Sequence, residues 1–155
     1  MAVQVRATYK LTGWNSTQLR LRIPAILTAF DKALYPEFKT QMKAVRYDWP
    51  ATWGANHPQA GKPRVTYRRN GQQVTTPRNI VDLGKLMNSQ ERIRSSATQL
   101  VYRWNAPYAA AVLKGYTTNR GTLVPERNWI KPTLDAVPLD QFFAREWRRL
   151  ASNRL

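Results

Sequence analysis

The sequence predicts a single α+β domain over residues 1–155, with helices packed on a small antiparallel sheet. Three observations indicate this class. An apolar stripe with helical spacing lies near the N-terminus, β-rich runs fill the middle, and a second helical stripe lies near the C-terminus. We expect a long bent N-terminal helix, a short helix, a C-terminal helix and a protruding β-hairpin. At 43% hydrophobic residues, the chain has enough apolar material to bury a core.

The first helix is predicted over 24–45, where apolar residues recur every three or four positions. These residues are Ile26, Leu27, Phe30, Ala33, Leu34, Phe38, Met42 and Val45. Pro24 suits a first helical turn, whereas Pro36 lies inside the stripe and removes a backbone donor. We therefore expect one long helix with a bend or a break after Leu34. The preceding run "STQLRLRI" alternates polar and apolar residues, so it is either a short strand or the lead-in to the helix.

An extended loop and a hairpin are predicted at about 47–79. Residues 47–63 hold prolines, glycines and tryptophans, which is typical of an irregular segment. Asn70-Gly71 then separates two β-rich runs, 65–69 and 72–76. Asn-Gly is a strong hairpin signal because both turn residues must tolerate a positive φ. The strands carry few apolar residues, so we expect the hairpin to project from the domain.

The second half begins with a short turn that Asp82 is predicted to cap, and Gly84 allows a close approach. Residues 91–95 and 99–104 are predicted to form an antiparallel pair. One face of this pair would carry Ile93, Leu100, Tyr102 and Trp104.

Two helices are expected to complete the chain. Pro107 starts a short helix that Gly115 ends as its C-cap. After a loop, Leu139, Phe142, Phe143, Trp147 and Leu150 recur at helical spacing, and Arg145, Arg148 and Arg149 lie on the outward face.

Positive charge is the most unusual property of the chain. Twenty-five Lys and Arg residues stand against nine Asp and Glu residues, giving a formal net charge of +16. Such an excess favours a polyanionic partner, which could be nucleic acid, an acidic protein surface or an anionic membrane. The basic residues are spread from Arg6 to Arg154, which is typical of a folded surface. Because no run of eighteen apolar residues and no apolar leader occurs, we expect neither a membrane span nor a signal peptide.

Residues suited to catalysis or metal binding are few. The chain has no cysteine and a single histidine, His57, in a polar loop. Asp48, Asp82, Glu91 and Glu126 show no spacing typical of a two-metal site, and caps or salt bridges explain them equally well. The sequence also has no phosphate-binding glycine loop and no nucleophile elbow. We expect no catalytic residue, no bound metal, no cofactor and no enzyme activity.

Two runs, "RVTYRR" and "LVYRWN", interleave aromatic and basic residues as single-strand binding surfaces do. Core packing is the favoured interpretation of Tyr102 and Trp104. The hairpin arginines Arg64, Arg68 and Arg69 are candidate contacts to phosphate or to an acidic neighbour, although a solvated face explains them nearly as well.

The order of motifs from Asp82 onward resembles the neck and tail-completion family of tailed bacteriophages, the minor tail components. "VDLGKLMNS", "PYAAAVLKGY" and "VPERNWIKPTLDAV" stand where that family has an acid-Thr-Gly run, a Tyr-Ala helix end and a Pro-x-Arg-x-Phe segment. The predicted N-terminal helix also stands at the corresponding place. Leu83 replaces the usual Thr and Trp129 the usual Phe, and the 47–79 segment is longer than in a minimal member.

The resemblance implies a structural virion protein at the head–tail junction, either a neck/tail-completion protein or a tail terminator. It implies a homo-oligomeric ring, expected to be hexameric, that joins the connector to the tail and lets the genome pass. The partners would be the adjacent connector or stopper ring, the tail-tube proteins and genomic DNA in the lumen, with no membrane. The protein would be found in the virion neck or tail after assembly in the host cytoplasm.

The matching residues would have structural or interface roles in such a ring. They are Asp82, Gly84, Leu86, Tyr108, Gly115, Pro125, Arg127 and Trp129. Two other classes stay open: a basic nucleic-acid-binding protein outside any virion ring, and a small nuclease. Salt-steep DNA affinity of the monomer would favour the first, and metal-dependent turnover would be needed for the second.

Overall fold

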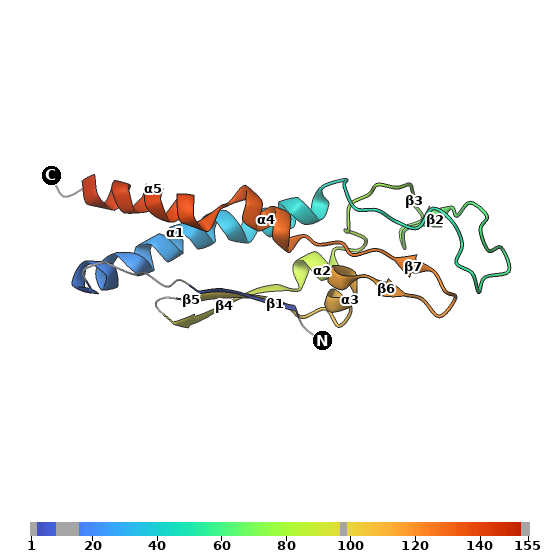
Figure 1. The fold of residues 1–155 in the computed structure, drawn as a ribbon, viewed down its shortest axis with the longest axis horizontal. Helices are drawn as coiled ribbons and strands as arrows, with labels where there is room; N and C mark the ends of the chain where they lie inside the picture. Colours follow the sequence, from blue (N-terminus) through green and yellow to red (C-terminus); the bar gives the residue numbers. More distant parts are fainter. Residues whose placement is uncertain (1–2, 9–15, 97–98, 153–155) are drawn as a thin grey trace.

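The computed structural model describes residues 3–8, 16–96 and 99–152, and it confirms the α+β class. The elements are β1 (Val3–Thr8), α1 (Ser16–Lys43), β2 (Thr66–Tyr67), β3 (Gln73–Val74), α2 (Lys85–Asn88), β4 (Gln90–Ser96), β5 (Gln99–Trp104), α3 (Ala109–Lys114), β6 (Tyr116–Thr117), β7 (Leu123–Val124), α4 (Ile130–Ala136) and α5 (Leu139–Ser152). The molecule is elongated (Figure 1). A layer of α1, α4 and α5 covers the main sheet over one part of its length, and the two small hairpins lie at the other end.

The main sheet has three antiparallel strands in the order β1-β5-β4. In the central strand β5, Leu100, Tyr102 and Trp104 lie on one face and are buried in the core beneath the helices. Val101, on the other face, is also buried. The pairing of β4 with β5 was predicted, but β1 as the third strand was not. Its Val3 and Val5 lie opposite Trp104 and Tyr102 and so extend the same apolar face.

The predicted position of Ile93 on that face is wrong. Ile93 lies directly opposite Val101 in the antiparallel register. Directly opposed residues share a face and successive residues alternate, so Ile93 is on the side away from Tyr102.

Helix α1 is longer than predicted, because it begins at Ser16 and includes the run 17–23. Pro24 therefore lies inside the helix rather than in its first turn, and Pro36 does not break it. The hydroxyls of Thr28 and Thr40 donate to the carbonyls of Pro24 and Pro36, at 2.8 and 3.4 Å. Val45 lies beyond the helix end and is 66% exposed, so its assignment to the apolar stripe is wrong.

Burial explains why two prolines are tolerated. A proline inside a helix costs about 3 kcal/mol, whereas burying one large apolar side chain contributes about 1.5–3 kcal/mol. Ile26, Phe30, Leu34, Phe38 and Met42 of α1 are all at most 1% exposed. The buried stripe therefore outweighs the local cost.

Aromatic rings connect the layers. Phe38 of α1 packs edge-on against Tyr102 and Trp104, with ring centroids 5.2 and 4.9 Å apart. Trp104 in turn meets Trp129, just before α4, at 5.5 Å. Tyr102 and Trp104 are 1% and 0% exposed, which confirms that they pack in the core. The helical stripe predicted near the C-terminus is α5, whose Phe142 packs against Phe30 at 5.4 Å.

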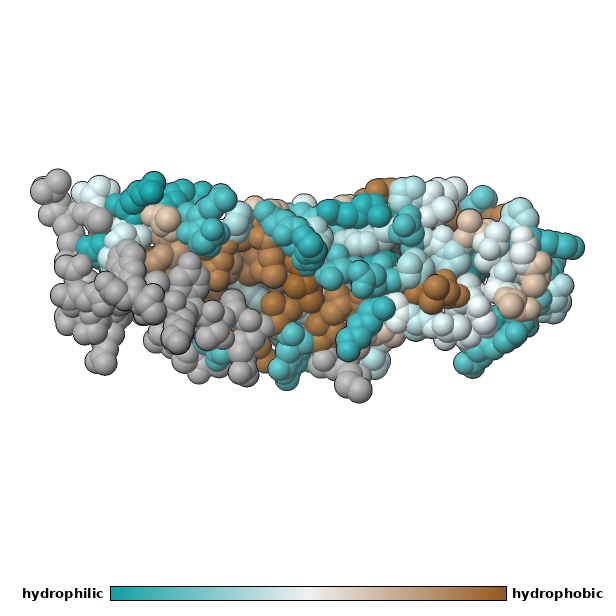
Figure 2. Space-filling view, viewed as in Figure 1, coloured by the Kyte–Doolittle hydropathy of each residue, from teal (hydrophilic) through white to brown (hydrophobic). Residues whose placement is uncertain are grey.

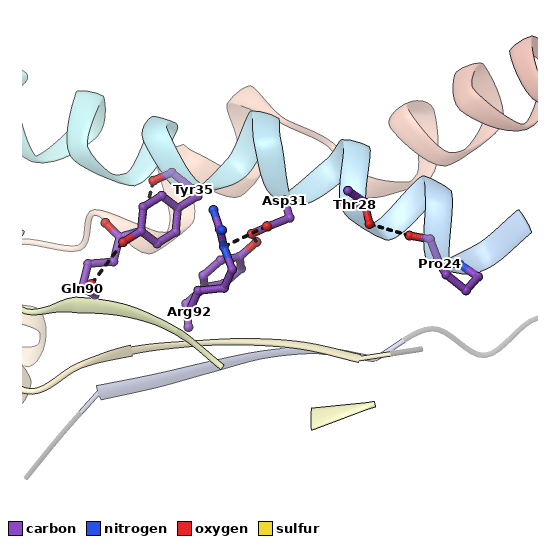
Figure 3. A network of polar contacts seen from close by, with 7 residues as sticks. Pro24, Thr28, Asp31, Tyr35, Gln90 and Arg92 are labelled. Carbon is purple, nitrogen blue, oxygen red and sulfur yellow. Dashed lines mark hydrogen bonds and ion pairs between the residues drawn. The ribbon is translucent and has the colours of Figure 1, made fainter. Parts of the chain in front are cut away.

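A buried polar clamp joins α1 to the sheet (Figure 3). The carboxylate of Asp31, 8% exposed, accepts a hydrogen bond from the Tyr102 hydroxyl at 2.9 Å and pairs with Arg92 Nε at 2.8 Å. One turn along, the hydroxyl of Tyr35 donates to the Gln90 carbonyl and the Gln90 side chain donates to the Tyr35 carbonyl. Burial, followed by the Asp31 hydrogen bond, raises the pKa of Tyr102 well above its ordinary value.

The expectation that Asp82 caps the following short helix is wrong. The N-cap of α2 is Gly84, and it makes no side-chain cap. Asp82 instead accepts a hydrogen bond from the Arg69 backbone N–H at 3.2 Å and lies 3.8 Å from Arg69 Nε. The Asp82 carboxylate, which could have capped the N-terminus of α2, thus accepts from the Arg69 N–H of the hairpin instead.

Gly84 and Gly115, the two glycines of the matching motifs, are required for different physical reasons. Gly84 has φ +73°, and a Cβ there would meet only the Asn88 side chain, so its backbone conformation matters more than close approach. Gly115 ends α3 as predicted, with φ +76°. A Cβ on Gly115 would lie 2.8 Å from Glu126 N and Val124 O, so this position also needs the empty space.

The Asn70-Gly71 hairpin forms, with strands of two residues each, shorter than predicted. Of the two turn residues, Gly71 has a positive φ and Asn70 does not, since every described residue with a positive φ is a glycine. The expectation of two left-handed turn residues is therefore wrong. Gly71 N donates to Arg68 O at 3.0 Å and Arg68 N donates to Gln72 O at 2.9 Å, which defines a three-residue turn. Residues of intermediate hydropathy, with scattered hydrophilic ones, cover most of this end, while strongly apolar residues are visible in the middle of the molecule (Figure 2).

Candidate functional site

A cationic cavity of about 270 Å³ lies between the β2–β3 hairpin, the segment 78–87 and α3. Its lining includes five cations, Arg68, Arg69, Arg78, Lys85 and Arg127, and one carboxylate, Asp82. The remaining wall is largely apolar and includes Ile80, Leu86, Met87 and Val112. The cavity therefore combines an apolar wall with a large excess of positive charge.

Three arginine side chains contact the ring of the Trp49 indole. The guanidinium carbons of Arg78, Arg127 and Arg64 lie 3.6, 4.9 and 5.6 Å from its centroid. Arg64 also lies 4.8 Å from the Trp53 ring, whose indole is stacked with His57 at 3.9 Å. Each cation–π contact stabilises by about 0.5–1 kcal/mol at exposed sites, and more where water is excluded. The tryptophans therefore favour a concentration of like charges.

Backbone bonds from three distant segments bring these side chains together. Tyr47 and Arg78 exchange both backbone hydrogen bonds at 2.9 Å, which places Arg78 beside Trp49 two residues along the chain. The backbone N–H of Trp49 donates to the Thr76 hydroxyl at 3.1 Å. Arg127 is held by its own N–H, which donates to the Val112 carbonyl at 3.1 Å.

The charges repel one another. Burial first, and then the neighbouring Arg127, Arg68 and Arg64, lower the pKa of Arg78 from 12.5 to about 10, while Asp82 opposes the shift. Burial also lowers the pKa of Arg127, partly offset by Tyr116. With a pKa of about 10, the Arg78 guanidinium keeps its proton at neutral pH, so the lowered pKa reflects the free-energy cost of holding the positive charge in this site.

Several donors of the cluster have no acceptor among the described residues. They are Arg68 Nε, Arg78 Nη2, Arg127 Nε and Trp49 Nε1, four of the nine buried side-chain atoms that lack a hydrogen-bond partner in the described part of the chain. Arg127 is only 8% exposed, so water reaches it poorly. A buried donor without an acceptor typically costs about 1–3 kcal/mol. Some pairing does occur, since Arg68 Nη2 donates to Asn79 Oδ1 at 2.6 Å.

The structure brings most of the sequence-predicted residues to this one cavity. Arg68, Arg69, Asp82, Gly84, Leu86, Tyr108 and Arg127 all line it. Arg64 lies beside them on the Trp49 ring, outside the lining. Three others do not contribute: Gly115 and Pro125 form a close backbone contact, and Trp129 is a core residue at 0% exposure.

Two central residues, Trp49 and Arg78, were missed in the sequence analysis. The usable signal was Trp49 itself, because a tryptophan in a polar, proline-rich loop needs a partner for its large apolar surface. Nothing in the local sequence identifies Arg78, which reaches Trp49 only through pairing with Tyr47.

The other candidate residues have local partners. His57 stacks on Trp53, and its Nδ1 accepts from the Gln59 N–H at 3.1 Å. Glu91 pairs with Arg103 at 2.7 Å. Within 3–8, 16–96 and 99–152, no three His, Cys, Asp or Glu side chains are grouped as metal ligands would be. None of the helices in the described part of the chain is long and apolar enough to cross a membrane.

Comparison with protein-family models gives no match, and neither curated proteins nor solved structures give a significant one. The resemblance to the tail-completion family therefore rests on the motifs and their order alone.

Proposed function

We propose that this protein is a structural virion protein of a tailed phage, forming a ring at the head–tail junction. The ring, most simply a hexamer, joins the connector to the tail and leaves a lumen for the genome. The protein would be a neck/tail-completion protein or a tail terminator. The observation that carries the proposal is the convergence of motif residues and hairpin arginines on one cationic cavity, between the β2–β3 hairpin, the segment 78–87 and α3.

The cavity has the properties of a docking surface. Its arginines are held in place by tryptophans and backbone bonds, yet their charge and several of their donors are unmatched within the described residues. An acidic neighbour would supply the missing charge, and complementary charge speeds encounter and fixes orientation. At +16, the chain needs partners of opposite charge to assemble closely.

The test is a triple charge reversal, Arg64→Glu, Arg68→Glu and Arg69→Glu, in the phage that encodes the protein. We expect head–tail joining to fall more than DNA retention in filled heads. Joined virions are counted by electron microscopy, and packaged genome is measured separately. Normal joining with altered DNA retention would reject the docking role and place the hairpin in the lumen.

A matched control reverses three exposed cations that do not line the cavity, Lys32, Lys43 and Arg148. It changes the net charge equally, so it separates a specific docking surface from a general need for positive charge. We expect joining to be less affected by this control than by the hairpin variant.

A nucleic-acid-binding protein outside a virion ring is the second candidate, favoured by the overall charge. In that case the isolated monomer would bind DNA with an affinity that falls steeply with salt, because each phosphate contact releases a counterion. The hairpin reversal would then abolish most of that affinity.

A further inference from the structure

The donors around Trp49 identify the kind of group that would complete the cluster. Arg68 Nε and Arg127 Nε are N–H groups, and Arg78 Nη2 belongs to the fork of a guanidinium. A guanidinium presents its N–H groups in a planar fork that matches two oxygens of one oxyanion. The missing group is therefore an oxyanion acceptor, held by more than one arginine.

We propose that the cavity is a carboxylate-binding site that takes an acidic side chain of a neighbouring protein, together with an apolar residue beside it. This inference rests on the docking role proposed above and names its chemistry. The carboxylate would lie among Arg78, Arg127 and Arg68, and the apolar residue would lie against Leu86 and Met87.

A second copy of this chain is a poor source of that carboxylate. Of its nine acidic residues, five already pair with cations of the same chain: Asp31, Asp82, Glu91, Asp135 and Glu146. A second copy would also add twenty-five more Lys and Arg residues. The occupant is therefore a segment of a different and acidic protein.

The geometry favours a protein carboxylate over nucleic acid. Arg127 is 8% exposed and shares its cavity with an apolar wall, whereas duplex phosphates lie on a convex, highly charged surface. Single strands bind by stacking bases on aromatic rings. Trp49 is already covered by Arg78 at 3.6 Å and Trp53 by His57 at 3.9 Å, which leaves these rings poorly placed for bases.

The site can be tested on the intact protein labelled with ¹⁵N-arginine. The side-chain Nε–Hε signals are assigned with single Arg→Met variants and followed while sodium glutarate, a carboxylate with an apolar stem, is added. We expect the Arg68 and Arg127 signals to shift and to saturate, while that of the exposed Arg148 does not. Inorganic phosphate, titrated in parallel, is expected to move the same signals less, because it has no apolar stem.

The protein source is then tested with a capped peptide of alternating Glu and Leu, at about 0.15 M salt to screen surface charges. Arg78→Met and Arg127→Met should each weaken binding about tenfold, because each removes a charge-assisted hydrogen bond. Arg148→Met should leave the affinity unchanged, and the peptide with Gln in place of Glu should not bind. Arg78→Met keeps the test valid if the buried Arg127 is needed for folding.

Two results would overturn the proposal. One is uniform shifts over all arginines with equal peptide affinity in all variants. The other is an oligothymidylate that displaces the peptide and saturates the same signals more tightly, which would assign the cavity to nucleic acid. Neither result uses virion assembly as a readout. A cavity that binds the peptide while the hairpin reversal leaves head–tail joining normal would reject the ring proposal and not the cavity.

Discussion

Replacing Arg78 by methionine is expected to stabilise the isolated protein. Burial and three neighbouring arginines lower the pKa of Arg78 from 12.5 to about 10. One pKa unit corresponds to about 1.4 kcal/mol, so a lowering of this size means that the charge destabilises the fold by at most about 3.5 kcal/mol. Arg78 is only half-buried, and solvent screening reduces the penalty to about 1–2 kcal/mol.

The substitution also removes a favourable contact. The guanidinium over Trp49 contributes about 0.5–1 kcal/mol, and a methionine sulfur on the same ring restores about 0.3–1.5 kcal/mol. The net expectation is a gain of about 1 kcal/mol in the free energy of unfolding. Since the folded state disfavours the charged form, the gain is full at neutral pH and declines only above pH 10, where the folded group loses its proton.

The gain is measured by urea unfolding at neutral pH and low salt. Arg148→Met is the control, because it removes the same charge from an exposed position in α5. It should change the free energy of unfolding by less than about 0.5 kcal/mol. Added salt should reduce the difference between Arg78→Met and the unmodified protein, because salt screens the repulsion among the arginines. A destabilised Arg78→Met protein beside an unaffected Arg148→Met protein would refute the view that the cluster opposes folding.

Three further substitutions test the fold. Trp129→Ala should lower the free energy of unfolding by about 3–5 kcal/mol, because the indole is fully buried; an unchanged denaturation midpoint would contradict its role as an anchor. Tyr102→Phe should weaken the loss of stability as the pH rises above 10, because the raised pKa means that unfolding releases the Tyr102 proton there. Equal stability losses between pH 8 and pH 11 in both proteins would oppose this. Gly115→Ala should destabilise more than Gly61→Ala, since both have a positive φ but only Gly115 has backbone atoms within 3 Å of a Cβ; equal melting temperatures would refute the steric reason.

Local patterns were sufficient where a single element decided the outcome. The apolar face of β5 with Leu100, Tyr102 and Trp104, the helical stripe of α5 and the end of α3 at Gly115 all formed as predicted. Each depends on side-chain periodicity or on a backbone preference, and both are readable within a few residues.

Contacts between distant segments could not be predicted in the same way. Pro36 stays inside a helix because Phe38 and its neighbours are buried against a sheet formed much later in the chain. Asp82 does not cap α2 because its carboxylate accepts a hydrogen bond from the Arg69 N–H of the distant hairpin. The candidate site is the extreme case, since Arg78 and Arg127 meet on Trp49 from three separate segments.

The two charged clusters of the molecule, the Asp31 clamp and the arginines around Trp49, differ in their electrostatic balance. Over the sheet, the buried carboxylate of Asp31 is matched by Arg92 and the Tyr102 hydroxyl, so its charge and its acceptors are satisfied within the chain. Around Trp49, the arginines repel one another and keep donors without acceptors, so an added anion would stabilise the cluster beyond what its cation–π contacts provide. A protein whose only task was to fold would replace Arg78 and Arg127 with apolar residues. Their presence beside the β2–β3 hairpin is therefore better explained by recognition of an anionic group than by stability, and this is the reason for proposing that an acidic partner completes the cluster.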